Sequence, residues 1–336
     1  MKGDKKRLLF VITQGVVGGA QKYVFDLAKH FNHSGRYDVA VAVGGDHGRY
    51  LFEALKKENI KTISVKNLAR NISVIGDLKT FFELMPGWKK KLAVLLEWKA
   101  AWFKDRIICV SQDDFNQALH HKIAPARKLY VVHNAVEVKF ALREKAYDEI
   151  AKIIGRQLPE GIRLVNMGRL YANKDLVHLV EEVSIIKNKL IDKNISLVIF
   201  GDGPERQRIE PRIKELNLGD NVFLTGDIPN ASQYLKTFDF LVLSSIKEGL
   251  PYSVLEAALA GLRIVSTEVG GVREIVGDDG LLAKPKAKGE LAELILNDLN
   301  EDDNKVRARI ERLKKSVVKN FNFETMVQKT EWVYKV

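Results

Sequence analysis

Residues 240–256 decide the fold, and they read Phe240-Leu-Val-Leu-Ser-Ser-Ile-Lys-Glu-Gly-Leu-Pro-Tyr-Ser-Val-Leu-Glu256. The apolar run at 240–244 predicts a strand, and the Gly-Leu-Pro break predicts a helix start, because proline is favoured at the first helical position. Glu248 then lies in the loop and Glu256 early on the helix, so two carboxylates point into one crevice. Such a helix start also offers backbone N–H groups and the positive end of its dipole to an anion.

Apolar strand-like runs separated by helical patterns recur along the chain and predict an α/β fold with parallel sheets. In the second half, strands are expected at 162–167, 195–200, 222–225, 239–243, 262–266 and 280–283, which make a complete doubly wound domain. In the first half they are expected at 7–13, 37–43, 60–65, 106–110 and 129–133. Two such domains leave a cleft between their strand ends, the usual ligand site of this architecture.

The length of 336 residues suits two domains. We place the N-terminal domain at 1–150 and the second domain at 151–315, because residues 139–157 are polar and lose the apolar periodicity. The chain then ends in a helix at 316–336, which we expect to pack back on the N-terminal domain.

The composition, 46% hydrophobic and 29% charged, is that of a soluble globular protein. No apolar run approaches the roughly 18 residues of a membrane span, so we expect a cytoplasmic protein. The single cysteine, Cys109, excludes an internal disulfide and a cysteine-based zinc site.

The net charge of +11 lies almost entirely in the first half of the chain. Residues 1–150 hold 26 Lys and Arg against 16 Asp and Glu, whereas residues 151–336 hold 28 against 27. The surplus suggests an anionic partner, either a membrane surface or an acidic acceptor, with nucleic acid a third and unlikely option. A basic surface that serves only solubility explains the charge equally well.

Residues 84–104 read as a basic amphipathic helix with tryptophans on its apolar side. Such a helix fits the interface of a membrane. A core helix that packs on the sheet is the more common use of the same pattern.

Two loops that follow predicted strands could bind a diphosphate. Gly15-Val-Val-Gly18-Gly19-Ala-Gln21 opens a helix, where glycine lets a phosphate approach backbone N–H groups. Gly168-Arg169-Leu-Tyr-Ala-Asn-Lys174 places two cations on one loop, where they could clamp a diphosphate and stabilise charge on a leaving group. Packing turns and solvated surface charges are the alternatives.

Two more glycine motifs lie near the same crevice. Gly201-Asp-Gly203-Pro-Glu205 favours a tight turn into a helix, although its backbone could touch a base or ribose. Gly270-Gly-Val-Arg-Glu274 is a further helix start, and its role stays open between structure and binding.

Together these motifs resemble the GT-B glycosyltransferases of family 4, the glycosyl transferase group 1 proteins, over the second domain and most of the first. The resemblance implies two Rossmann-like doubly wound domains that face a cleft. It implies a retaining transfer of a sugar from a nucleoside diphosphate sugar to a hydroxyl of a glycan or lipid-linked acceptor. No metal and no cofactor are implied, and the chain has no Asp-x-Asp triplet. The location implied is the cytoplasm or, as a peripheral protein, the inner membrane face.

The resemblance also assigns roles to residues. Arg169 and Lys174 would hold the diphosphate, Glu256 would accept hydrogen bonds from the ribose, and Glu248 would sit at the donor sugar. Glu248, Arg169 and Lys174 are the implied catalytic residues. The remaining donor-binding positions implied are Gly18, Gly19, Gly168, Gly201, Gly203, Gly249 and Leu250, with the amides of the last two near the sugar.

The sequence departs from the family in its first half. The expected segment with its histidine is missing near 84–88, and about 40 residues of an ordinary doubly wound domain are absent. We therefore expect a shortened N-terminal domain. His133 stands where the family commonly has proline, and we expect it to be a strand-end residue. The alternative function is a catalytically impaired or partner-dependent relative that binds a nucleotide sugar.

Overall fold

The computed structural model describes residues 5–16, 18–44, 49–65, 98–99, 102–190 and 193–335. The chain forms two compact units, residues 1–78 and 79–336. The predicted boundary at 150 was placed where the apolar periodicity is lost, whereas this division follows contacts within the fold, so the boundary stays a prediction. The predicted gap at 84–88 and most of the amphipathic segment at 84–104 lie outside the described residues.

The first unit contains a three-stranded parallel sheet in the order β1-β2-β3. Its elements are β1 (Lys6–Ile12), α1 (Gly19–His33), β2 (Tyr37–Gly44), α2 (Arg49–Lys57) and β3 (Lys61–Val65). Leu27, Ala28 and Phe31 of α1 are buried, and the ring of Phe31 contacts Phe10 and Tyr37. The strands match the three predicted ones to within one residue at each end.

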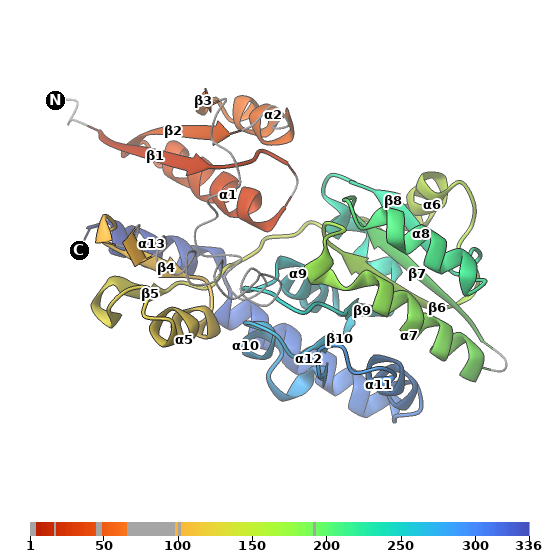
Figure 1. Cartoon of the computed structure of the whole chain (residues 1–336). Coiled ribbons are helices and arrows are strands. Elements are labelled where there is room, and N and C mark those ends of the chain that lie inside the picture. The colour runs from red at the N-terminus through yellow and green to blue at the C-terminus, as the bar shows by residue number, and fades with distance from the viewer. Residues whose placement is uncertain are drawn as a thin grey trace. The chain divides into compact units, whose positions relative to one another are not determined.

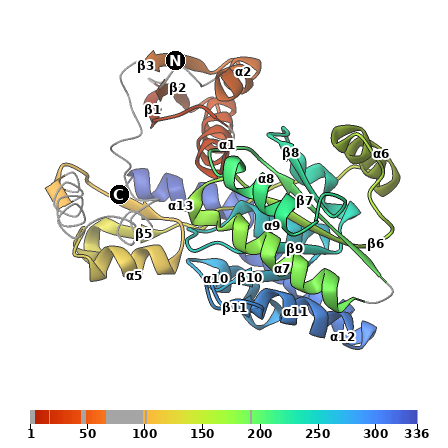
Figure 2. The ribbon, with the colours of Figure 1, turned by 45° about the vertical axis from the view of Figure 1, so that its right-hand side comes forward.

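The second unit begins with a small parallel sheet of two strands. Its elements are β4 (Ile107–Cys109), α5 (Gln112–His120), the 3₁₀ helix η1 (Ala126–Lys128) and β5 (Leu129–Val131). Ser111 is the N-cap of α5, because its hydroxyl accepts a hydrogen bond from the Asp114 amide at 3.0 Å. The C-terminal helix α13 (Phe323–Lys335) lies beside these strands (Figures 1 and 2), and Arg106 donates a hydrogen bond to the carbonyl of Val333 at 2.7 Å.

The rest of the second unit is a doubly wound domain around a six-stranded parallel sheet in the order β11-β10-β9-β6-β7-β8. Its strands are β6 (Gly161–Met167), β7 (Asn194–Phe200), β8 (Val222–Gly226), β9 (Phe240–Leu243), β10 (Arg263–Thr267) and β11 (Leu281–Ala283). All six agree closely with the predicted runs. The strand order runs outward in both directions from the β6–β9 pair, so the topological switch point lies between these two strands.

Helices and 3₁₀ turns surround this sheet. They are α6 (Arg143–Ile154), η2 (Ala172–Lys174), α7 (Leu176–Lys189), α8 (Arg206–Glu215), η3 (Ala231–Thr237), α9 (Tyr252–Ala260), α10 (Val272–Val276), η4 (Gly277–Asp279), α11 (Glu290–Leu299) and α12 (Asp303–Asn320). The predicted helix start at Pro251 is wrong by one residue: Pro251 is the extended residue just before α9, and Tyr252 begins the helix. The terminal helix predicted at 316–336 covers the end of α12 and the separate helix α13 (Phe323–Lys335), since the chain breaks at Phe321 and Asn322.

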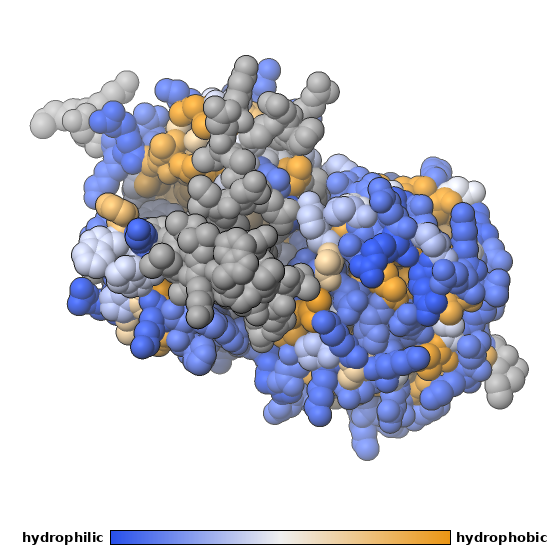
Figure 3. All heavy atoms as spheres, viewed as in Figure 1, coloured by the Kyte–Doolittle hydropathy of each residue, from blue (hydrophilic) through white to orange (hydrophobic). Residues whose placement is uncertain are grey.

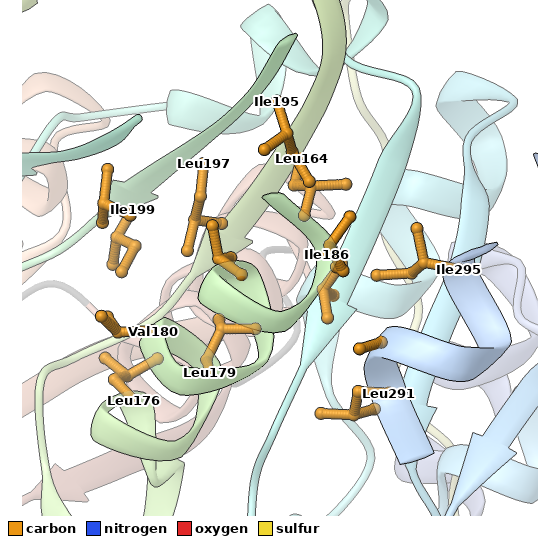
Figure 4. Packing of buried hydrophobic residues seen from close by; sticks show 14 of the residues in the cluster. Leu164, Leu176, Leu179, Val180, Ile186, Ile195, Leu197, Ile199, Leu291 and Ile295 are labelled. Atoms are coloured by element: carbon orange, nitrogen blue, oxygen red, sulfur yellow. The ribbon is translucent and has the colours of Figure 1, made fainter. Parts of the chain in front are cut away.

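Buried aliphatic side chains from the sheet and from α7, α8 and α11 form the main core of this domain. Figure 4 shows Leu164, Ile195, Leu197 and Ile199 of the strands facing Leu176, Leu179, Val180 and Ile186 of α7 and Leu291 and Ile295 of α11. Each such side chain contributes about 1.5–3 kcal/mol on full burial. This core fixes the strands, and the loops at their carboxyl ends are thereby fixed as well. The face of the domain seen in Figure 3 is mainly hydrophilic, with hydrophobic side chains in separate small patches.

Candidate active site

The ion pair between Lys174 and Glu248 lies at the topological switch point. Lys174 ends the loop after β6, and Glu248 follows β9, the neighbouring strand. Lys174 Nζ lies 2.6 Å from Glu248 Oε1, and Ser245 Oγ donates to the same oxygen at 2.6 Å. The two side chains are 19% and 9% exposed. Open α/β sheets bind ligands at this place, outside the carboxyl ends of the strands.

Hydrogen bonds to backbone carbonyls hold the two loops in place. Ser244 Oγ donates to the carbonyl of Lys174 at 2.8 Å, and the Ile246 amide donates to the carbonyl of Asn173 at 2.8 Å. Thr267 of the next strand donates to the carbonyl of Ser245. The ion pair is therefore supported by a rigid frame, which favours a defined position of both charges.

Arg169, the second predicted cation, lies in the same loop as Lys174. Its guanidinium stacks over the ring of Tyr171, with 4.9 Å between the charge centre and the ring centroid. Gly168, directly before it, lies against the Lys174 side chain: a Cβ on Gly168 would come within 3.7 Å of Nζ. The loop thus keeps both cations near the end of β6.

Gly201 and Gly203 bring the loop after β7 against the loop after β6. A Cβ on Gly201 would lie 2.0 Å from the carbonyl oxygen of Gly168, and one on Gly203 would lie 2.5 Å from that of Leu170. The Leu170 amide also donates to the carbonyl of Asp202 at 2.9 Å. These contacts give both glycines a packing role, in line with the tight turn favoured from the sequence. Pro204 favours a helix start at its own position. The helix that follows, α8, instead begins two residues later, at Arg206.

Gly270 and Gly271 pack against the loop that carries Glu248. A Cβ on Gly270 would lie 2.0 Å from the carbonyl oxygen of Glu248, and the Gly271 amide donates to the carbonyl of Gly249 at 2.6 Å. The Leu250 carbonyl in turn accepts a hydrogen bond from Asn134 Nδ2 at 2.8 Å. Sequence reasoning left the Gly270–Glu274 motif open, and these contacts show that it supports the Glu248 loop.

The carboxylate of Glu274 binds the start of α5. It accepts hydrogen bonds from the Gln112 amide at 2.8 Å and the Asp113 amide at 3.0 Å, and it lies 3.0 Å from His133 Nε2. Partial burial by itself raises the pKa of Glu274, but the bonds from His133 and the two amides outweigh it, so this pKa is lowered. Sequence reasoning missed this contact, because Glu274 lies 141 residues from His133 along the chain.

Asp114 lies on the α5 side of the same contact. Its Oδ2 would be 3.5 Å from a Cβ on Gly249, beside the Glu248 loop. Burial raises the pKa of Asp114 to about 6, although the Ser111 hydroxyl and the charge of Lys247 oppose the shift. An acidic side chain therefore approaches the Glu248 loop from the segment that sequence reasoning assigned to the N-terminal domain.

The other predicted residues are placed as follows. Glu256 lies on α9 and is 9% exposed. Gly18 directly precedes α1, and Gly19 begins it, in the first compact unit. The structure thus brings together Gly168, Lys174, Gly201, Gly203, Glu248, Gly249 and Leu250 through direct contacts of their loops.

Within the part of the chain that the structure describes, no helix combines the length and the apolar composition of a membrane span. No group of three or more His, Cys, Asp or Glu residues there has the arrangement of a metal site.

Known proteins share both the sequence pattern and the fold. Residues 150–316 match the family described as glycosyl transferases group 1. The N-acetyl-alpha-D-glucosaminyl L-malate synthase of Bacillus anthracis is 27% identical over 232 residues, covering 68% of this chain and 59% of that protein. An Escherichia coli enzyme, UDP-Gal:alpha-D-GlcNAc-diphosphoundecaprenol alpha-1,3-galactosyltransferase, is 28% identical over 264 residues, covering 73% and 65%.

Among solved structures, Anabaena HepE in complex with UDP and glucose superposes with a TM-score of 0.82 at 19% identity, covering 98% of this chain and all of that one. These structural neighbours have the GT-B fold, so the predicted fold class is confirmed. Residues 150–316 belong to the glycosyl transferases group 1 family, and the chain has the GT-B fold. It spans between 49% and 65% of the length of the first four curated relatives that it matches.

Proposed function

We propose that this protein is a retaining glycosyltransferase that moves a sugar from a nucleoside diphosphate sugar to an acceptor hydroxyl without a metal ion. The Lys174–Glu248 pair at the switch point is the observation that carries the proposal. It puts a cation for phosphate and an acceptor of sugar hydroxyls side by side at the usual ligand site of the fold. The UDP-glucose and UDP complexes of HepE support a nucleoside diphosphate as the donor's leaving group.

In this proposal Lys174 and Arg169 bind the diphosphate. When the bond between the sugar's anomeric carbon and the diphosphate oxygen breaks, negative charge grows on the leaving group. Preorganised cations stabilise this charge more strongly in a partly buried site than in water. The side chain of Lys174 is 19% exposed and its ammonium is already held by Glu248, so little reorganisation is needed.

Glu248 and the amides of Gly249 and Leu250 would fix the donor sugar. The carboxylate has one oxygen engaged by Lys174 and Ser245, which leaves its second oxygen available to sugar hydroxyls. Glu256 would accept hydrogen bonds from the ribose. Gly168, Gly201 and Gly203 would line the donor site with backbone, and Gly18 and Gly19 are also proposed to bind the diphosphate.

The same two cations are the reason to propose a metal-independent reaction. They can neutralise a diphosphate that other enzymes bind through Mg²⁺. A chelator should therefore leave turnover unchanged. Restoration of a chelator-inhibited enzyme by Mg²⁺ or Mn²⁺ would contradict this part of the proposal.

For the acceptor we propose a glycan or a lipid-linked saccharide, used at the cytoplasmic face of a membrane. The relative from Escherichia coli is named for an acceptor linked to diphosphoundecaprenol, which supports the lipid-linked choice. The basic surplus of residues 1–150 suits an anionic membrane surface. Nucleic acid is not proposed as a partner.

The test measures release of nucleoside diphosphate from a panel of nucleotide sugars, with donor binding followed by calorimetry. Lys174→Ala and Glu248→Gln should each lower kcat/KM at least a hundredfold, because each removes a group that acts on the reacting part of the donor. Lys187→Ala is the matched control, since that lysine is exposed on α7, outside the donor loops, and donates a hydrogen bond to the Asn217 carbonyl. The anomeric configuration of the product, read by NMR, decides between retention and inversion.

Two other outcomes are informative. Donor binding without hydrolysis or transfer would select the alternative from the sequence, a relative that binds nucleotide sugars but is impaired or needs a partner. Neither binding nor turnover across the panel would contradict the proposed function.

A further inference from the structure

Five large aromatic side chains of the second unit are exposed near β4 and β5. Trp98, Trp102 and Phe103 precede β4 and are 46%, 71% and 87% exposed. Trp332 and Tyr334 of α13 are 55% and 42% exposed. Single exposed apolar residues are ordinary on a protein surface, but a contiguous group marks a contact surface.

Contacts connect three of these residues, Trp98, Trp102 and Trp332, through Lys128 and Tyr130. The rings of Trp98 and Trp102 meet edge to face at 5.9 Å between centroids. Lys128 donates to the carbonyls of Trp102 and Lys104, at 3.4 and 2.7 Å. Two residues further, in β5, the ring of Tyr130 meets that of Trp332 at 5.5 Å. The segment before β4 and the helix α13 therefore both contact residues 128–130 at the end of η1 and in β5.

The surroundings of this surface are strongly basic. Residues 98–99, 102–106, 127–130 and 328–335 contain seven Lys or Arg residues but only two acids, Asp105 and Glu331. Lys99, Arg127, Lys329 and Lys335 are exposed. Glu331 is paired with Lys335 at 3.0 Å, which further reduces the local negative charge.

We propose that this aromatic–basic surface, formed by Trp98, Trp102, Phe103, Trp332 and Tyr334 with the surrounding Lys and Arg residues, binds the headgroup region of an anionic lipid bilayer. Tryptophan and tyrosine prefer the interface of a membrane, where the ring is in apolar surroundings and its polar atom meets water. Each Lys or Arg near an anionic membrane adds attraction over a distance of about a Debye length, roughly 8 Å in physiological salt.

A bilayer suits this surface better than a protein partner does. A protein interface is depleted of lysine in its centre, whereas here lysines lie beside the exposed rings. Rings and cations on a surface can attach a protein to a membrane without a spanning helix. This inference rests on the proposed function only for the purpose of the surface, which would bring the enzyme to a lipid-linked acceptor.

The experiment measures co-sedimentation of the full chain with vesicles of phosphatidylcholine alone and of phosphatidylcholine mixed with phosphatidylglycerol. The wild-type protein should bind the mixed vesicles, lose most of this binding in high salt and bind pure phosphatidylcholine at least tenfold more weakly. The double variant Trp102→Ser/Phe103→Ser should bind the mixed vesicles at least tenfold more weakly than the wild type. Arg127→Glu/Lys329→Glu should weaken binding similarly, with a smaller salt dependence.

Leu142→Ser is the matched control, because Leu142 is also 71% exposed but lies before α6 at a distance along the chain from this surface. It should bind vesicles like the wild type. The substituted side chains are exposed, so the melting temperature should not change, and thermal melts will verify this. Absence of wild-type binding, or equal binding by Trp102→Ser/Phe103→Ser, would overturn the proposal. So would a change of oligomeric state in this variant without a change in vesicle binding, since the surface would then join two copies.

Vesicle binding needs no turnover, so this result is independent of the donor panel. Vesicle binding together with a failed donor panel would keep this surface and remove the proposed function. Donor turnover on a water-soluble acceptor together with absent vesicle binding would support the proposed function and contradict the membrane-binding surface.

Discussion

Glu274 and His133 form a contact of 3.0 Å that ties the loop and short helix α10 after β10 to the residues that follow β5. The same carboxylate binds two amides at the start of α5, where the helix dipole favours a negative charge. Gly270 and Gly271 of the same loop support the backbone of Glu248 and Gly249. One short motif thus connects α5 to the predicted donor loop.

Removal of the Glu274 carboxylate should destabilise the second unit. We expect Glu274→Ala to lower the free energy of unfolding by about 2–3 kcal/mol, because two backbone donors and His133 lose a charged acceptor. The pKa of Glu274 is lowered in the folded protein, so its contribution is present above the ordinary value of 4.5 and is lost as the pH falls through the folded value. Denaturant unfolding at pH 7 measures the effect.

Glu268→Ala is the control for this prediction. Glu268 forms an ion pair with Arg273 near the same loop, but the two side chains are 48% and 52% exposed. Exposed pairs contribute about 0–1 kcal/mol. Equal losses in the two variants would show that the Glu274 contact adds nothing beyond a surface charge.

The strands were predictable because each carries its own local signal. The apolar runs at 162–167 and 195–200 are bounded by polar residues, and β6 and β7 match them to within one residue. The last strand, β11, was also predicted correctly, although Gly280 of the predicted run at 280–283 is not part of it. Burial on both faces of a parallel sheet leaves this continuous apolar pattern in the sequence.

The partners of polar residues were much less predictable. The Gly168–Lys174 and Glu248 motifs were recognised separately, but the direct bond between Lys174 and Glu248 depends on β6 and β9 becoming neighbours. His133 was expected to be only a strand-end residue, and no local pattern reveals its contact with Glu274. Long-range pairing follows from strand order, which a single sequence indicates only weakly.

Asp114 should make stability depend on pH. Because burial raises its pKa from 3.8 to about 6, the folded state binds this proton more tightly than the unfolded state. The free energy of unfolding should therefore fall as the pH rises from about 4 to 6, by at most about 3 kcal/mol from this group. Asp114→Asn should remove that fall. The free energy of unfolding of the variant should therefore increase relative to that of the wild type between pH 4 and pH 7. Urea unfolding at these two pH values tests the prediction, and a difference that does not change with pH would contradict it.

Glu182 should be important for stability although it lies outside the donor loops. It is fully buried and accepts hydrogen bonds from the amides of Gly289 and Ala292 at the start of α11, at 2.6 and 2.8 Å. Glu182→Ala should lower the free energy of unfolding by about 3–5 kcal/mol, since it leaves buried donors without an acceptor and creates a cavity. Its neighbour Glu181 pairs with Arg212 and is 30% exposed, so Glu181→Ala should cost less than about 1 kcal/mol. Thermal melts of the two variants give the comparison, and similar melting temperatures would refute it.

Gly270 and Gly277 offer a matched test of whether the Glu248 loop must keep its position for donor binding. Both have φ of +53°, a backbone conformation that residues with a Cβ rarely adopt, so an alanine is strained at either position. A Cβ on Gly270 would lie 2.0 Å from the Glu248 carbonyl oxygen, whereas nothing lies within 4 Å of one on Gly277. Gly270→Ala must therefore displace the Glu248 loop, and on the proposed function it should weaken binding of a nucleoside diphosphate sugar at least tenfold. Gly277→Ala should reduce stability only and leave the dissociation constant within about twofold. Calorimetry with both variants at a temperature where each is folded decides the matter, because equal donor affinities would mean that the donor does not depend on the Glu248 loop.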